Sequence, residues 1–340
     1  MKSAVTQNDV AKEAGVTRSM VSYVISGNSD RSVAPETRKR ILDAIERLGY
    51  RPNKAAQALQ QGDVGFAANK IGVVLCTSET FLRPYYAEIL SGIHLEAHEQ
   101  NFQVSFIRFF HELKNPVLFN SLIHEEEIGG LILVATDQCL KTDEDKKIIA
   151  KIKERLSKIV CVEFQYEGLS SVMFDRQATA QRATEYLIQK GFSEIGYIGE
   201  DDDRVHGVQL ALSEKNLDAK RDNFFIAETF DMCGGFNAIY SFPADKKIPR
   251  AIVCGSDEVA IGVLRGLSKK NISVPNDVAI ISIDNIEISE YTCPPLTTMN
   301  VQKKAMGEQA VKMIVSGTAG KDECALKIML PSSLIVRESC

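Results

Sequence analysis

The sequence predicts a small all-α head followed by an α/β body of two similar lobes. Within the first sixty residues, short helical motifs follow one another closely. From Ile71 onward, apolar strands alternate with helical stretches, a pattern typical of parallel α/β layers. The chain of 340 residues is long enough for two or three domains, and the number of predicted strands suits two lobes better than one sheet.

Two helices joined by a short turn are predicted at the start of the chain. Thr6 can cap the first helix while Asp9, three positions later, bonds back to it. The helix ends near Ala14, because Gly15 readily adopts the left-handed conformation of a tight turn. Thr17 then caps a second helix that runs to about Ile25, with Met20, Val21 and Val24 facing inward and Arg18, Ser19, Ser22 and Tyr23 facing outward.

This arrangement is typical of a helix-turn-helix motif, in which the second helix reads the major groove of DNA. Arg18 at its amino-terminal end could bond guanine, and Ser19 several base edges. An ordinary solvated helical hairpin would have the same spacing. The charge distribution favours DNA, since residues 1–60 hold ten Lys and Arg against six Asp and Glu, whereas the rest of the chain holds 30 against 39.

A third helix is predicted from Pro35 to Leu48, with Gly49 ending it. Three stretches of the chain together resemble the lactose/galactose-repressor family: TQNDVAKEAGVTRSMVSYVISG, VAPETRKRILDAIERLGYRPNKAAQAL and the later PPLTT. The resemblance covers essentially the whole chain. It implies a DNA-binding domain in residues 1–60 with a hinge helix at 53–59, a linker at 61–70 and an effector-binding, dimerising body at 71–340.

The resemblance further implies two flavodoxin-like lobes of the periplasmic-binding-protein type, with three chain crossings between them. The N-lobe is expected at about 71–163 and 293–320, and the C-lobe at about 164–290 and 324–340. In this family the hinge orders on operator DNA and a leucine, here Leu59, enters the minor groove beside a small residue, here Ala56. Tyr23 stands where the family usually has Arg. The predicted DNA contacts are Thr6, Thr17, Arg18, Ser19, Ser22, Tyr23, Asn28, Tyr50, Asn53, Ala56 and Leu59.

Candidate effector contacts follow the predicted strands, because ligands of parallel α/β sheets bind at the carboxyl ends of strands. Asp137, Ser256, Asp257 and Asp284 hold such positions, and the ligand is expected in the cleft between the lobes. The resemblance adds Arg204 as the clamping arginine, Phe230 as the stacking aromatic, Tyr85 and Tyr86 as entrance residues, and Glu163. For Asp257 we favour the role of a helix cap over ligand contact. Asp284 could instead cap a turn, and Tyr85 and Tyr86 could belong to the core.

Other classes of protein find little support in the sequence. It has no membrane-length apolar run and no secretory signal, so we expect a cytoplasmic protein. Phosphate-binding, dinucleotide-binding and nucleophile-elbow motifs are missing, which argues against an enzyme, and no cofactor or metal is expected. The eight cysteines occur singly, which argues against a disulfide framework, and we expect Cys76, Cys161 and Cys254 to be buried thiols.

These patterns predict a regulator that binds a pseudo-palindromic operator as a homodimer and responds to a small effector, by default a repressor released by a sugar. Two alternatives remain. One is a regulator that needs a co-repressor, either a purine or a phosphorylated carrier protein. The other is a solute receptor or sugar-processing enzyme in which the head is merely an interaction module.

Overall fold

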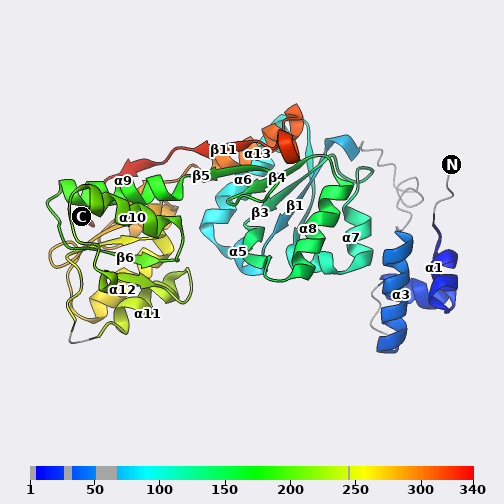
Figure 1. Cartoon of the computed structure of the whole chain (residues 1–340), viewed down its shortest axis with the longest axis horizontal. Coiled ribbons are helices and arrows are strands. Elements are labelled where there is room, and N and C mark those ends of the chain that lie inside the picture. Colours follow the sequence, from blue (N-terminus) through cyan, green and yellow to red (C-terminus); the bar gives the residue numbers. More distant parts are fainter. Residues whose placement is uncertain (1–4, 27–32, 51–66, 244–245) are drawn as a thin grey trace. The chain divides into compact units, whose positions relative to one another are not determined.

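The computed structural model describes residues 5–26, 33–50, 67–243 and 246–340 (Figure 1). It divides the chain into two compact units. The first unit comprises Met1–Val172 and Lys304–Lys327, and the second comprises Met173–Lys303 and Ile328–Cys340. The chain therefore passes between the units three times, the number of crossings that the family resemblance implied.

The head consists of three helices that begin and end where the sequence signals predict. Helix α1 (Gln7–Ala14) has the predicted capping box, in which the Asp9 amide donates to Thr6 Oγ1 (3.3 Å) and the Thr6 amide donates to Asp9 Oδ2 (2.8 Å). Gly15 ends the helix with φ of 64°, a conformation that a residue with a Cβ atom adopts only at a cost. Helices α2 (Arg18–Ser26) and α3 (Pro35–Leu48) follow.

A small apolar core holds the three helices of the head together. Val10 and Ala14 of α1, Val21 of α2 and Ile41 of α3 are among its buried members. Met20, predicted to face inward, is 41% exposed instead, because the buried positions of α2 are Val21 and Val24.

The first unit contains a sheet with the strand order β11-β5-β4-β3-β1-β2. The pairings β1–β2, β1–β3, β3–β4 and β4–β5 are parallel, so these five strands have the flavodoxin-like order 2-1-3-4-5. The strands are β1 (Lys70–Leu75), β2 (Gln103–Phe109), β3 (Gly130–Val134), β4 (Ile159–Val162), β5 (Ser170–Phe174) and β11 (Lys327–Leu330).

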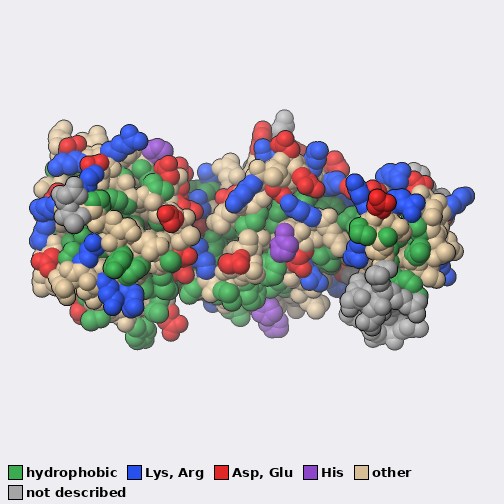
Figure 2. Space-filling model, turned by 90° about the horizontal axis from the view of Figure 1, so that it is seen from below, with side chains coloured by type: hydrophobic (Ala, Val, Ile, Leu, Met, Phe, Trp, Pro, Cys, Tyr) green, Lys and Arg blue, Asp and Glu red, His purple; other side chains and the backbone are tan. Residues whose placement is uncertain are grey.

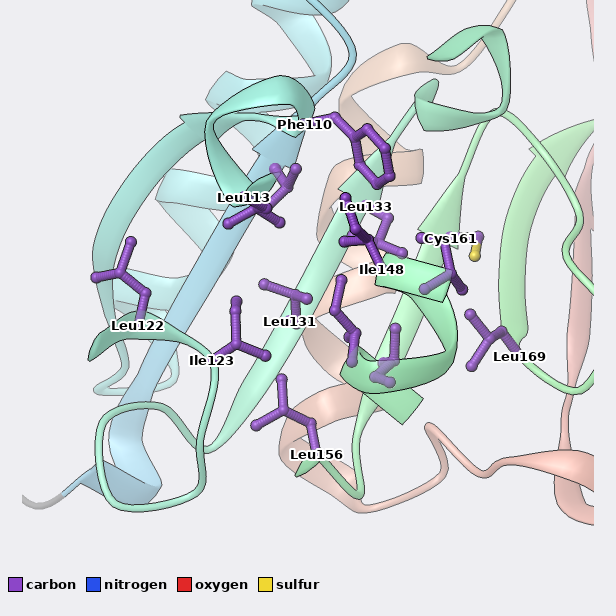
Figure 3. Close-up of a cluster of buried hydrophobic side chains, with 14 of the residues drawn as sticks. Phe110, Leu113, Leu122, Ile123, Leu131, Leu133, Ile148, Leu156, Cys161 and Leu169 are labelled. Atoms are coloured by element: carbon purple, nitrogen blue, oxygen red, sulfur yellow. The ribbon is translucent and has the colours of Figure 1, made fainter. Parts of the chain in front are cut away.

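Helices and 3₁₀ turns connect these strands and cover the sheet. They are η1 (Ala67–Asn69), α5 (Ser78–Leu82), α6 (Pro84–Glu99), η2 (Phe110–Lys114), α7 (Pro116–Leu122), η3 (Thr136–Cys139), α8 (Asp143–Arg155), α13 (Lys303–Ser316) and η6 (Asp322–Cys324). Figure 3 shows part of the core, in which Leu131 and Leu133 of β3 meet Ile148 of α8 and Phe110. Strand β3 is fully buried, as expected for an inner strand of a parallel sheet.

The second unit repeats this plan with the strand order β12-β10-β9-β8-β6-β7. All its pairings are parallel except that of β10 with β12. The strands are β6 (Ile195–Gly199), β7 (Phe224–Ile226), β8 (Ala251–Cys254), β9 (Ala279–Asp284), β10 (Thr297–Asn300) and β12 (Ser333–Ile335). The helical elements are α9 (Arg176–Gln189), α10 (Asp203–Glu214), η4 (Arg221–Asn223), α11 (Met232–Tyr240), α12 (Asp257–Lys269) and η5 (Glu287–Tyr291).

The boundaries of the two lobes differ from the expected ones. Residues 293–303 were expected in the N-lobe, but β10 pairs with β9 and β12 and therefore belongs to the second unit. Residues 164–172 were expected in the C-lobe, but β5 pairs with β4 of the first sheet. Of the expected linker at 61–70, residues 67–69 form η1 and Lys70 already begins β1. Among the described residues, no helix has the length and apolar character needed to cross a bilayer.

Candidate functional site

The amino-terminal end of α2 presents a group of polar side chains on the surface of the head. Arg18 and Ser19 are exposed, and Ser22 and Tyr23 are half-buried. The Arg18 Nε atom is 3.4 Å from Gln7 Oε1 of α1, a contact that links the two helices on the side where α2 begins. These four side chains of α2 offer one guanidinium and several hydroxyls, which suit the edges of bases in a major groove.

The two threonines among the predicted DNA contacts also hold the helices of the head in shape. Thr6 is the N-cap of α1, and the Thr17 hydroxyl accepts a hydrogen bond from the Met20 amide (3.4 Å). Figure 2 shows Lys and Arg side chains gathered on the head beside exposed hydrophobic ones. Such a surface suits the phosphates that flank a groove.

Tyr50 does not lie on this surface. Its side chain is only 4% exposed and belongs to the head core, so its assignment as a DNA contact was wrong. The prediction rested on the place of Tyr50 in the GYRPN motif. In the structure, Tyr50 follows Gly49 and packs against α3. Four other predicted contacts lie outside the described residues, as does the predicted hinge helix at 53–59: Asn28, Asn53, Ala56 and Leu59.

In the second unit, several predicted effector residues gather at the carboxyl ends of the parallel strands. Strands β6 and β8 are neighbours whose following connections lie on opposite sides, which is the switch point where ligands of such sheets bind. Arg204 lies in the first turn of α10, which follows β6. Its guanidinium carbon is 5.0 Å from the ring centroid of Phe230, which follows β7, and 5.8 Å from that of Phe174, at the end of β5.

The Arg204 guanidinium is buried and held by carboxylates. Its Nη1 atom is 2.5 Å from Asp202 Oδ2 and 4.0 Å from Glu200 Oε2. Burial opposes the charge and so tends to lower the pKa of Arg204, but the attraction of Asp202, together with that of Asp284, raises this pKa above its ordinary value. Arg204 therefore stays a cation between two aromatic rings, an arrangement that could bind hydroxyl or carbonyl oxygens of a ligand.

The two residues after Gly255, which follows β8, have other roles than those expected for them. Ser256, expected to contact an effector, is fully buried and caps α12 through its hydroxyl, which accepts from the Val259 amide (3.2 Å). Asp257, expected to be that cap, instead accepts hydrogen bonds from Ser282 (2.5 Å), Thr298 (2.6 Å) and the amide of Ile286 (2.8 Å). Burial raises the pKa of Asp257 above its usual range, while these hydrogen bonds oppose the shift.

Asp284 ends β9 in an unusual backbone conformation, with φ of 123°. A non-glycine residue keeps such a conformation only where its surroundings hold it. The buried ammonium of Lys303 does so, because its Nζ atom donates to the carbonyl oxygens of Asp284 (2.6 Å) and Asn285 (3.2 Å). The Asn285 side chain in turn accepts from Arg337 (2.9 Å). Lys303 was not among the predicted site residues, because a lysine at the first position of a helix gives no signal of this role.

In the first unit, the predicted residues occupy separate elements. Tyr85 and Tyr86 are both buried on α6, with their rings in a T-shaped contact at 5.2 Å between centroids. Glu163 follows β4 with φ of 74° and is buried. Asp137 lies in η3, directly after β3, and is exposed. Asp137 and Glu163 thus lie at the carboxyl edge of the first sheet, the ligand-binding edge in this topology.

Two cysteines at the same edge form a disulfide, which the sequence analysis did not predict. Cys76 follows β1 and Cys139 ends η3, with 5.8 Å between their Cα atoms. Strands β1 and β3 are neighbours in the sheet, so residues 63 positions apart in the sequence meet at its edge. The expectation of a buried Cys76 thiol was therefore wrong, whereas Cys161 and Cys254 are buried free thiols as expected.

Comparison with known proteins identifies the family. Residues 6–53 match the model of "Bacterial regulatory proteins, lacI family", and residues 184–340 match the model of the "Periplasmic binding protein-like domain". The chain thus combines a lacI-family helix-turn-helix domain with a periplasmic-binding-protein-like domain. This confirms the family that the motifs of the head predicted. The protein is a DNA-binding transcriptional regulator, as the helix-turn-helix signals indicated.

Relatives match this regulator over nearly its whole length. The "HTH-type transcriptional repressor PurR" of Mannheimia succiniciproducens is 28% identical over 98% of both chains. Two solved structures have the same fold, each with a TM-score of 0.67. The "transcriptional regulator CelR-cellobiose complex" is 24% identical and covers 99% of this chain and 100% of its own. The lac repressor dimer bound to operator and the anti-inducer ONPF is 21% identical and covers 99% of each chain. They confirm the predicted fold of a helix-turn-helix head with a two-lobed α/β body.

Proposed function

We propose that this regulator is a cytoplasmic homodimeric repressor that binds a pseudo-palindromic operator and whose affinity for that operator is switched by a small effector, by preference a sugar or sugar derivative. The observation that carries the effector proposal is Arg204, a buried cation between Phe230 and Phe174 at the switch point of the second sheet. Aromatic faces suit a sugar ring, and charged groups suit its hydroxyls.

Within the second unit, Arg204, Phe230 and Asp284 are the proposed effector contacts. In the first unit, Asp137 is the proposed contact best placed to reach a ligand, because it is exposed at the strand-end edge, whereas Tyr85, Tyr86 and Glu163 are buried. The named relatives support both kinds of effector weighed from the sequence, since one has a name that refers to purines and another was solved with cellobiose.

On the DNA side, we propose that Arg18, Ser19, Ser22 and Tyr23 read the operator and that Leu59 enters its minor groove. The lac repressor relative was solved as a dimer on its operator, which supports a symmetric pair of heads on this regulator's DNA. A function at an operator also accounts for a cytoplasmic location, and we propose no enzymatic activity.

A gel-shift titration with candidate ligands tests the proposal. Full-length protein on an operator fragment is titrated with sugars, sugar phosphates and purine nucleobases chosen from a thermal-shift screen. Loss of DNA binding on addition of a sugar identifies an inducer, as proposed. A gain of DNA binding with a purine would instead show a co-repressor. If none of these compounds stabilised the protein in the thermal-shift screen, the effector proposal would be contradicted.

A further inference from the structure

We propose that the Cys76–Cys139 pair is a reversible thiol–disulfide site whose oxidation state controls how firmly the turn that carries Asp137 is held at the carboxyl edge of the first sheet. The consequence for effector binding rests on the function proposed above, whereas the redox site itself does not.

The position of the pair in the fold is the first argument. Strands β1 and β3 run in parallel, with Leu75 beside Val134, so the residues after them lie at one edge. The sheet order places the switch point between these two strands. The disulfide therefore ties together the two strand ends that border the ligand-binding position of the first sheet.

The two cysteines differ in exposure, and a reagent would reach the pair through Cys139. Cys76 is 3% exposed, but Cys139 is half-buried in a turn at the surface. In the reduced protein, a low-molecular-weight disulfide such as oxidised glutathione is attacked by the Cys139 thiolate, which forms a mixed disulfide and releases one glutathione thiolate. The Cys76 thiolate then displaces the second glutathione. The two electrons of the protein thiols reduce glutathione, and their two protons pass to solvent.

The nearest other thiol in the sheet does not compete for this exchange. Cys161 in β4, next to β3, is fully buried, and Figure 3 shows it among the core side chains Leu133 and Leu169. Burial, reinforced by the negative charge of Asp137, raises the pKa of the Cys161 thiol, so little of it is the reactive thiolate.

The disulfide is a covalent restraint on the turn that follows β3. Ala135 enters the turn with φ of 50°, and Cys139 and Leu140 are only partly buried against the core. Reduction removes the covalent link to Cys76, so the turn and Asp137 gain freedom. Disulfides in proteins of a reducing compartment are usually transient, and are either catalytic or redox-sensing.

Thiol mapping and hydrogen exchange on the full-length protein test the proposal. The protein is equilibrated with oxidised glutathione or with dithiothreitol, alkylated, and digested for mass spectrometry. We expect a Cys76–Cys139 cross-link in the first sample and two alkylated thiols in the second, with the same circular dichroism. Amide exchange in residues 136–140 should be at least several-fold faster after reduction.

Two variants sharpen the comparison. In Cys139→Ser the turn should exchange at the reduced rate in both buffers, whereas Cys233→Ser, which changes an exposed cysteine of α11, should behave as the unaltered protein. The proposal is overturned if no cross-link forms in folded protein, if its reduction requires denaturant, or if exchange in 136–140 is the same in both states. None of these readouts uses DNA or an effector, so their outcome is independent of the proposed function.

Discussion

The guanidinium carbon of Arg204 lies 5.0 Å from the centroid of the Phe230 ring, although the two residues follow different strands of the second sheet. A cation over an aromatic face is stabilised by the electrons of the ring, more so where water is excluded. Because Asp202 also pairs with it, Arg204 is a fixed, charged donor rather than a mobile surface arginine. This relationship is the structural basis of our proposal that Arg204 and Phe230 contact the effector.

Replacing Arg204 with Ala should weaken the effector response and leave DNA binding intact. Losing a charge-assisted hydrogen bond costs about 1.5–3 kcal/mol, which raises the effector concentration for half-response by about 10- to 100-fold. The gel-shift titration measures it. Arg265→Ala, which removes an exposed arginine from α12, is the matched control and should respond normally. A normal dose-response for Arg204→Ala would remove Arg204 from the site.

Replacing Arg18 with Ala should weaken operator binding by about 1–3 kcal/mol and relax the preference for one base pair, because a base-edge contact is lost. Competition gel shifts with operator variants measure both effects. Arg47→Ala is a suitable control, since Arg47 lies near the end of α3, is largely exposed and pairs with Glu13 (3.0 Å). If Arg18→Ala weakened binding to all sequences equally, Arg18 would contact phosphate and not a base.

Replacing Asp257 with Ala should destabilise the second unit. The change leaves buried donors of Ser282, Thr298 and Ile286 without their acceptor, which costs about 2–4 kcal/mol of the free energy of unfolding. Urea unfolding followed by circular dichroism checks this value. Glu287→Ala, an exposed change in η5, should stay within about 0.5 kcal/mol of the unaltered protein. Equal stability of the two variants would contradict the structural role of Asp257.

The ion pair between Asp145 and Lys114 predicts a pH dependence of stability. Lys114 Nζ is 2.7 Å from Asp145 Oδ1, and this hydrogen bond, with those from Thr142, lowers the pKa of Asp145 from 3.8 to about 2. A carboxyl whose pKa is lowered by folding stabilises the protein above the unfolded pKa, and this contribution is lost as the pH falls through the folded one.

The unaltered protein should therefore be more stable than Asp145→Asn at pH values above the unfolded pKa, and the difference should shrink as the pH approaches that of the folded group. Urea unfolding of both proteins along a pH series measures the difference in free energy. A difference that does not change with pH would show that the charge of Asp145 contributes nothing.

Local signals in the sequence were enough to locate the three helices of the head. The Thr6–Asp9 capping box and the glycines that end α1 and α3 depend only on neighbouring residues, and they occur as predicted. Apolar runs such as 251–254, which forms the buried strand β8, indicate inner strands for the same reason. Strands β5, β7, β10, β11 and β12 were not predicted from the sequence.

Features that depend on pairing across the chain could not be predicted. The assignment of β10 and β5 to their sheets depends on which strand lies beside them, and nothing in either segment encodes that choice. The Cys76–Cys139 disulfide could not be predicted for the same reason, since its two cysteines meet only because β1 and β3 are neighbours. Ser256 and Asp257 are both capable of capping α12, and only the polar partners around Asp257 decide between them.

The salt dependence of operator binding tests the central claim most directly. A palindromic duplex is selected by the full-length protein from a random-sequence pool, and its affinity is measured by fluorescence anisotropy between about 50 and 200 mM salt. We expect tight binding to the selected duplex, weak binding to a scrambled one, and a fall in affinity of about 10³-fold or more across this range as counterions are released from the phosphates. Equal affinity for both duplexes that does not change with salt would contradict the central claim.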